Sequence, residues 1–171
     1  SLPPVLVAVA DLAFVPVLAA KVLTQLLQRP KLQQMIFVLM LTLFWIGNLM
    51  VHLEWMGITD DTLWAGLRVG LTSLGALVMI LGGRVTPGFT KNAMVQSGRL
   101  TGWPQNPGPL AAVAIVGAIS QPVGNILGVD PFWLGPLALI AGVAGLVRVA
   151  LWRGIWARGR PILWVLHLSY A

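Results

Sequence analysis

Apolar residues dominate long stretches of this chain, and the charged residues lie mainly between these stretches. The stretches are Leu2–Leu27, Gln34–Leu53, Thr62–Gly82, Pro109–Leu127 and Pro131–Leu151, and a further one runs from Pro161 to Ala171. An α-helix needs about 20 apolar residues to cross the ~30 Å hydrocarbon core of a bilayer. The pattern therefore predicts an all-α fold, a polytopic transmembrane helix bundle with five full spans and the start of a sixth.

The same stretches favour helices over the strands of a membrane barrel. Only these two structures pair every backbone group inside a bilayer, and barrel strands alternate apolar and polar residues. Met35–Phe44 and Leu110–Ile119 show no such alternation. Hydrophobic residues make up 57% of the 171 residues and charged residues only 9%, which is far more apolar than a typical soluble domain.

The charges between the spans predict how the chain is oriented. Basic residues occupy every second connection, at Arg29, Lys31, Arg84, Lys91, Arg99, Arg153, Arg158 and Arg160. Acidic residues occupy the other connections, at Glu54, Asp60, Asp61 and Asp130. Because basic loops stay in the cytoplasm, the N-terminus is expected outside. This topology accounts for the net charge of +6 without a nucleic-acid partner.

We interpret residues 1–171 as a single transmembrane domain, because no Ser-rich or charged linker divides them. The chain begins without methionine and ends inside an apolar stretch, so we expect it to be a fragment of a longer multi-pass protein. It contains no cysteine. That absence excludes disulfides, thiolate metal sites, iron–sulfur clusters and covalent c-type haem attachment.

The connection after the third span contains several helix-ending signals. Gly82 and Gly83 suit the end of a helix, and Pro87 is expected to prevent the helix from resuming. Thr90 is placed to cap a short interfacial helix that runs to about Ser97. The sequence therefore predicts that the helix of the third span ends at Gly82.

Asp11 and Arg68 are oppositely charged residues inside two predicted spans. Asp11 and Arg68 fall at similar depths in the outer leaflet, since both spans enter from outside. An unpaired charge in a membrane is costly, so the two residues are predicted to form an ion pair. The pair has two readings, as part of a functional site or as a structural contact that fixes helix packing.

Further polar residues lie at the same depth. Asn48 and His52 are four residues apart and therefore share a helix face, and so do Gln121 and Asn125. Together with the two charges they predict a polar layer in the outer third of the bundle. Hydrogen bonding between helices is the alternative explanation for the three amides.

His52 and His167 are the two histidines of the chain. Neutral imidazole is the usual nitrogen ligand of copper and haem iron, although a histidine near a helix end is often only hydrogen-bonded. His167 lies ~10 Å into the bilayer from the inner face, whereas His52 is close to the outer face. They are thus too far apart to bind one metal together, and their partners would lie elsewhere in a longer chain.

Four segments carry a family resemblance: Asp11–Phe14, Gly47–His52, Gly82–Thr90 and Pro161–Tyr170. The segment GGRVTPGFT is similar to GGRVIPFFT at the inner end of a span in the NnrS family, and PILWVLHLSYA is similar to its PLWILHLGYA. The other two segments agree with that family's aspartate-containing helix and its asparagine/histidine helix end. The chain therefore resembles the middle of an NnrS family member.

The resemblance implies a haem- and copper-containing protein of the bacterial cytoplasmic (inner) membrane, linked to nitric oxide stress and denitrification. It implies His52 and His167 as cofactor- and metal-binding residues. Asp11, Asn48, Arg68 and Arg84 would support them, and the polar layer adds Gln121 and Asn125 to this group. The expected partners are the lipid bilayer, nitric oxide and a redox protein.

Two other functions remain open from the residues alone. A transporter or channel would use the outer polar layer as its substrate site, and Pro122 in the fourth span favours this reading because broken helices line transport sites. A membrane assembly or sensor subunit without chemistry would use every polar residue for packing.

Overall fold

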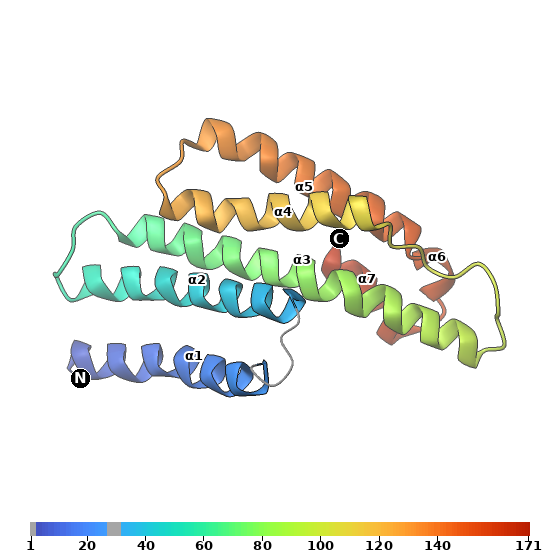
Figure 1. The fold of residues 1–171 in the computed structure, drawn as a ribbon, viewed down its shortest axis with the longest axis horizontal. Coiled ribbons are helices and arrows are strands. Elements are labelled where there is room, and N and C mark those ends of the chain that lie inside the picture. The colour runs from blue at the N-terminus through green and yellow to red at the C-terminus, as the bar shows by residue number, and fades with distance from the viewer. Residues whose placement is uncertain (1–2, 27–31) are drawn as a thin grey trace. The chain divides into compact units, whose positions relative to one another are not determined.

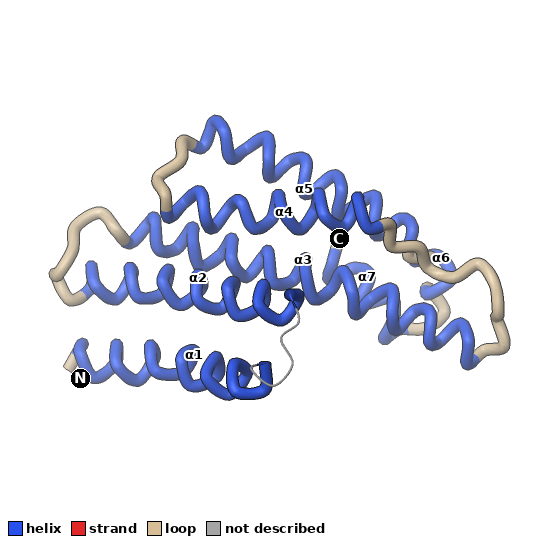
Figure 2. The backbone as a smooth tube through the Cα atoms, viewed as in Figure 1, coloured by secondary structure: helices blue, strands red, loops and turns tan. Residues whose placement is uncertain are grey.

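The computed structural model describes residues 3–26 and 32–171, and these residues contain helices and connections but no strand (Figure 1, Figure 2). The helices are α1 (Pro4–Leu26), α2 (Leu32–Trp55), α3 (Leu63–Gln96), α4 (Gly108–Ile126), α5 (Pro131–Leu151), α6 (Gly154–Ala157) and α7 (Pro161–Tyr170). The predicted all-α fold is confirmed. The basic residues Arg29 and Lys31 lie outside the described residues.

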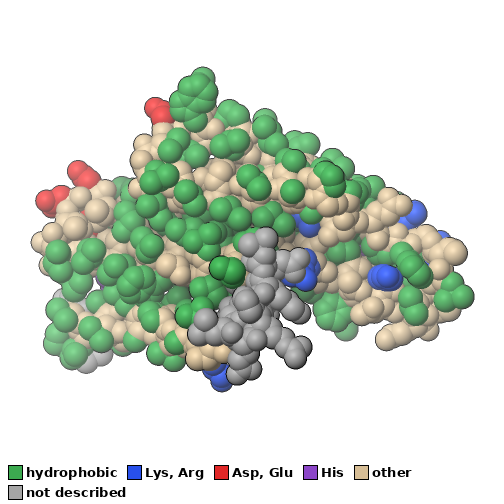
Figure 3. Space-filling model, viewed as in Figure 1, with side chains coloured by type: hydrophobic (Ala, Val, Ile, Leu, Met, Phe, Trp, Pro, Cys, Tyr) green, Lys and Arg blue, Asp and Glu red, His purple; other side chains and the backbone are tan. Residues whose placement is uncertain are grey.

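Among the described residues, four helices are long and apolar enough to cross a membrane: Met35–Trp55, Leu63–Gln96, Gly108–Ile126 and Pro131–Leu151. The helix α1 has 23 residues, and α7 is a shorter apolar helix of 10 residues. Large apolar side chains remain exposed, such as Leu71 at 68% and Leu139 at 70%, and Figure 3 shows such side chains over the visible helices. This surface suits a lipid environment, whereas the count of five spans and the start of a sixth stays a prediction.

The chain forms two compact units that are not continuous in sequence. The first unit contains Ser1–Gly75 and Gln121–Asp130, and the second contains Ala76–Ser120 and Pro131–Ala171. Both α3 and α4 contribute residues to each unit. The interpretation as a single transmembrane domain stays a prediction.

Glycines allow α2 and the first part of α3 to approach closely in the first unit. A Cβ atom added to Gly47 would lie 2.7 Å from the carbonyl oxygen of Gly66 and 2.7 Å from the backbone nitrogen of Gly70. Without hydrophobic driving force in lipid, helices associate through such close backbone packing. Gly47 and Gly66 therefore fix the distance between these two helices.

The predicted break after Gly82 is wrong, because α3 continues without interruption to Gln96. Pro87 has no N–H and leaves the carbonyl of Gly83, four residues earlier, without its helical donor. In the structure Arg148 Nη2 donates to this oxygen at 3.1 Å and Asn106 Nδ2 donates to it at 3.0 Å. Side chains from outside the helix replace the missing bond, so the proline is tolerated.

Thr90 is likewise not a helix cap. It is buried inside α3, and its Oγ1 donates a hydrogen bond of 2.8 Å to the carbonyl oxygen of Thr86. A threonine hydroxyl commonly bonds one turn back when it lies within a helix. The predicted short helix is therefore the last part of α3.

A second proline is accommodated in the same way in the first unit. Pro16 interrupts the hydrogen-bond ladder of α1 and frees the carbonyl of Leu12. The indole Nε1 of Trp45 on α2 donates to this oxygen at 2.8 Å. The bond ties α1 to α2 at a defined position along both helices.

The contact at Gly83 predicts that alanine substitution has different effects on stability at two glycines of α3. A Cβ atom at Gly83 would collide with the guanidinium of Arg148, whereas a Cβ at Gly88 meets nothing within 4 Å. Gly83→Ala should therefore lower the free energy of unfolding by about 2–4 kcal/mol. Gly88→Ala should be neutral or stabilise by up to about 1 kcal/mol.

Thermal unfolding of the full-length protein in detergent compares the two variants with the wild type. Equal stabilities for the two alanine variants would contradict the close contact between Gly83 and Arg148.

Candidate functional site

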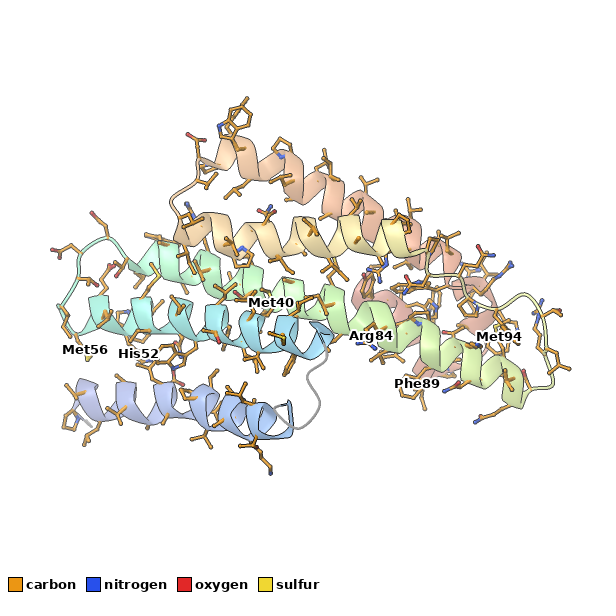
Figure 4. All side chains as sticks on the ribbon, viewed as in Figure 1. Met40, His52, Met56, Arg84, Phe89 and Met94 are labelled. Atoms are coloured by element: carbon orange, nitrogen blue, oxygen red, sulfur yellow. The ribbon has the colours of Figure 1, made fainter. Side chains whose placement is uncertain are left out.

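A carboxylate, an amide and an imidazole meet between α1 and α2. Asn48 Nδ2 donates to Asp11 Oδ2 at 2.6 Å, and His52 Nε2 lies 3.0 Å from the same oxygen. We call these three residues the Asp11 cluster. The side chain of His52 is 8% exposed and that of Asp11 is 55% exposed, and Figure 4 shows His52 on the side of α2 that faces α1.

The sequence spacing of α2 explains why these groups meet. Trp45, Asn48 and His52 are three and four residues apart and share one face of the helix. Trp45 binds the carbonyl of Leu12 that Pro16 frees, and this contact brings the adjacent Asp11 to the same face. The predicted grouping of Asn48 and His52 on one face is confirmed by their shared partner.

The predicted ion pair between Asp11 and Arg68 is wrong. Among the described residues the carboxylate of Asp11 is bonded to α2, and Arg68 lies on an exposed face of α3. The face of α2 that packs against α3 contains Gly47, two positions from Trp45 and therefore on the opposite side of the helix. Because α2 lies between α1 and α3 at this point, the two charges do not meet.

The imidazole of His52 is held on two sides. Its Nε2 contacts the Asp11 carboxylate, and the ring of Trp55 packs edge-on with 5.6 Å between the ring centroids. An ionised carboxylate only accepts hydrogen bonds, so Nε2 carries the proton. Within the described part of this unit Nδ1 has no hydrogen-bond partner, and its lone pair remains for a ligand.

Gln121 and Asn125 belong to the same unit but not to the Asp11 cluster. Asn125 Nδ2 donates to the carbonyl oxygen of Gln121 at 2.8 Å, which is a bond within α4. The structure therefore brings together three residues of the predicted polar layer, Asp11, Asn48 and His52. The role of the other residues stays a prediction.

The second unit contains a polar cluster that the sequence analysis missed. Arg148 of α5 is buried, with its Nε bonded to Asn106 Oδ1 at 3.0 Å and its Nη1 bonded to the hydroxyl of Tyr170 at 2.9 Å. Its Nη2 binds the carbonyl of Gly83, and its guanidinium lies 5.4 Å from the ring centroid of Trp152. We call these residues the Arg148 cluster.

Arg148 was missed because it stands near the end of an apolar helix, where arginine side chains commonly reach toward the interface. A buried arginine costs about 2.5–3.5 kcal/mol at a helix centre on insertion scales. The three bonds to Asn106, Tyr170 and Gly83 offset this cost. The sequence signal that points to them is Pro87, which frees the carbonyl that the guanidinium binds.

Both ring nitrogens of His167 face backbone carbonyls. Nδ1 lies 2.8 Å from the oxygen of Leu163 and Nε2 lies 3.3 Å from the oxygen of Trp152, and the residue is 2% exposed. The ring also lies against Gly154, where an added Cβ would be 3.3 Å from its Cδ2. In this arrangement His167 offers no free nitrogen to a metal.

Arg84 differs from Arg148 although both lie next to Gly83. The side chain of Arg84 is exposed on α3 (Figure 4), whereas that of Arg148 takes the buried position beside the Gly83 carbonyl. Among the described residues of its unit, Arg84 has no hydrogen bond to His167, and its supporting role stays a prediction.

Comparison with known proteins identifies the family of this chain. A family model described as NnrS protein matches residues 1–171. The chain belongs to the NnrS family. No curated protein and no solved structure matches it.

Two of the NnrS-like segments meet in the structure. A Cβ atom on Gly82 would lie 2.7 Å from Cδ2 of Tyr170, and the Tyr170 hydroxyl donates to the carbonyl of Met79 at 3.3 Å. Arg148 joins both segments, because it binds Gly83 in one and Tyr170 in the other. The paired glycines of this NnrS segment thus make room for an aromatic ring and a guanidinium.

The described residues of this NnrS chain do not form a complete metal site. Within residues 3–26 and 32–171, no group of three or more His, Cys, Asp or Glu side chains is placed to hold a metal ion. His52 has one nitrogen that suits a ligand, whereas His167 has none. The described residues therefore supply one imidazole and not a complete metal site.

The contact between α1 and α2 predicts that the effects of substituting Trp45 and Pro16 on stability depend on one another. Trp45→Phe removes the donor to the Leu12 carbonyl and should destabilise the protein by about 1–3 kcal/mol, the usual cost of an unsatisfied buried group. Pro16→Ala restores a helical N–H to that carbonyl, so the double variant should lose less stability than the sum of the two single variants. The measurement is unfolding of the full-length protein and its variants in the same detergent. Additive effects would contradict the shared carbonyl.

Proposed function

We propose that this chain is part of a haem- and copper-containing membrane protein of the nitric oxide response and denitrification, and that His52 is a metal ligand in it. Membership of the NnrS family supports the general function. The observation that carries the proposal is the Asp11 cluster, in which a carboxylate orients the imidazole of His52.

The geometry suits a histidine that binds a metal through Nδ1. A ligating histidine usually donates its other N–H to a carboxylate, which fixes the tautomer and raises the basicity of the ligating nitrogen. Asp11 takes this role toward Nε2 of His52, and Asn48 donates to the same carboxylate oxygen. Trp55 limits the rotation of the ring. The metal would supply electron transfer and a coordination position for nitric oxide.

Nitric oxide is small and apolar, so it reaches a metal inside a helix bundle through the lipid. A cleft of about 280 Å³ between α2 and α3 is lined mainly by apolar residues and glycines, and Asn48 of the Asp11 cluster also lines it. We place the protein in the bacterial cytoplasmic membrane with the N-terminus of this chain outside, and a redox protein as its partner. Arg68, Arg84, Gln121 and Asn125 are supporting residues in this proposal.

His167 does not fit the proposed metal as well as His52 does, because both its nitrogens face carbonyl oxygens. The proposal therefore assigns one ligand to the described residues. This difference between the two histidines makes His167 a matched control.

The test is iron and copper analysis with optical and electron paramagnetic resonance spectra on the full-length protein, expressed with both metals supplied. His52→Ala should lose the metal signal, whereas His167→Ala should keep it in the fraction that remains folded. Asp11→Asn should weaken metal retention by about 10–100-fold, as for other residues that orient a metal ligand.

Retention of both metals in a folded His52→Ala variant would overturn the assignment of His52. A folded wild-type protein without haem or copper would overturn the redox function, and a transport role for Asp11 would then be the function to test.

A further inference from the structure

The second unit carries seven Lys and Arg residues and no Asp or Glu, and the structure describes all of its residues. The basic residues are Arg84, Lys91, Arg99, Arg148, Arg153, Arg158 and Arg160. Arg148 is buried among neutral hydrogen-bond partners, whereas most of the others are exposed. Because no carboxylate of this unit balances them, their counter-charges come from outside the unit.

Two of these charges converge on one point of the α3–α4 connection. The Nη2 atoms of Arg99 and Arg153 each lie 4.0 Å from the position that a Cβ atom of Gly102 would take. The two guanidinium nitrogens are thus no more than about 8 Å apart, and like charges at this separation repel one another although both side chains are exposed. Neither side chain has an ion-pair partner among the described residues of the unit.

A third cation and two backbone contacts complete the arrangement. Lys91 Nζ lies 4.3 Å from the ring centroid of Trp103, whose Nε1 donates to the carbonyl of Arg99 at 3.4 Å. The connection is tied to the end of α5, because Gln105 N donates to the oxygen of Leu151 at 3.1 Å. We call Lys91, Arg99 and Arg153 the Gly102 basic site.

The backbone at this site is held in uncommon conformations. Gly102 has φ +69°, and Arg153 has φ 63°, in the left-handed region that a residue with a Cβ rarely adopts. The left-handed turn at Arg153 follows α5 and precedes α6. A strained backbone conformation of this kind persists where contacts with the surrounding structure enforce it. At this site the conformation places Arg153 beside Arg99.

We propose that the Gly102 basic site binds the phosphate of an anionic phospholipid. A phosphate has several acceptor oxygens and a negative charge, and it would relieve the repulsion between the two arginines. Apolar groups suited to the lipid lie in the same connection, since Leu100 is 71% exposed and the Trp103 ring is also exposed. Tryptophan and arginine are typical of the headgroup level of a membrane, and clusters of basic residues bind acidic lipids there.

The test uses the full-length protein in detergent, with bound lipids counted by native mass spectrometry. Phosphatidylglycerol is compared with phosphatidylcholine of the same acyl chains. The wild type should bind phosphatidylglycerol in preference, and Arg99→Gln/Arg153→Gln should weaken that binding by about tenfold to thirtyfold, the loss of two surface contacts of this kind.

The matched control is Lys21→Gln/Arg158→Gln, which removes the same charge from two exposed residues that do not belong to the Gly102 basic site. It should bind phosphatidylglycerol within about twofold of the wild type, and both double variants should keep their elution volume and unfolding temperature. Inorganic phosphate at millimolar concentration should not displace the lipid.

Three results would overturn the proposal. The first is equal binding of the two lipids, and the second is an equal loss in the control variant, which would indicate a diffuse charge effect. The third is displacement by inorganic phosphate, which would indicate a site for a soluble anion.

Discussion

The hydrogen bond from Arg148 to the carbonyl of Gly83 is the interaction on which the second unit depends. Pro87 frees this carbonyl in the middle of α3, and an unsatisfied backbone group is costly where no water can reach it. The guanidinium satisfies the carbonyl, and the carbonyl in turn stabilises a buried charge that has no carboxylate partner within its unit. Each group thus offsets the cost of burying the other.

The first unit uses the same device for a different purpose. The carbonyl of Leu12, freed by Pro16, binds Trp45, and this bond sets the position of α1 along α2. One residue earlier on α1, Asp11 then reaches Asn48 and His52. A proline in α1 therefore determines which side chain orients the imidazole, so helix packing and the candidate ligand are linked.

Local rules were sufficient for part of this arrangement. Length and apolar composition predict the helices, and the four-residue spacing of Asn48 and His52 predicts that they act on one face. Contacts between helices were harder to predict. Charge and depth alone paired Asp11 with Arg68, whereas in the structure α2 lies between the helices that carry them. The rotation of each helix decides such contacts, and these apolar helices carry too few polar positions to fix it.

The continuity of α3 also depends on contacts between segments that are far apart in the sequence. Gly82, Gly83 and Pro87 are helix-ending residues when only their own segment is considered. Their effect changes once Arg148 and Tyr170, more than sixty residues later in the sequence, fill the space that the glycines leave. Signals that are local in sequence were therefore overridden by partners that are distant in sequence.

The most direct test of this account is the distance between Arg148 and Gly83 in the membrane. Solid-state NMR of the full-length protein in bilayers, with ¹⁵N in arginine side chains and ¹³C in glycine carbonyls, measures it through their dipolar coupling. The account predicts a coupling that matches the 3.1 Å contact between Nη2 and the carbonyl oxygen and that disappears in Gly83→Ala. An unchanged glycine–arginine coupling in that variant, or none in the wild type, would contradict it.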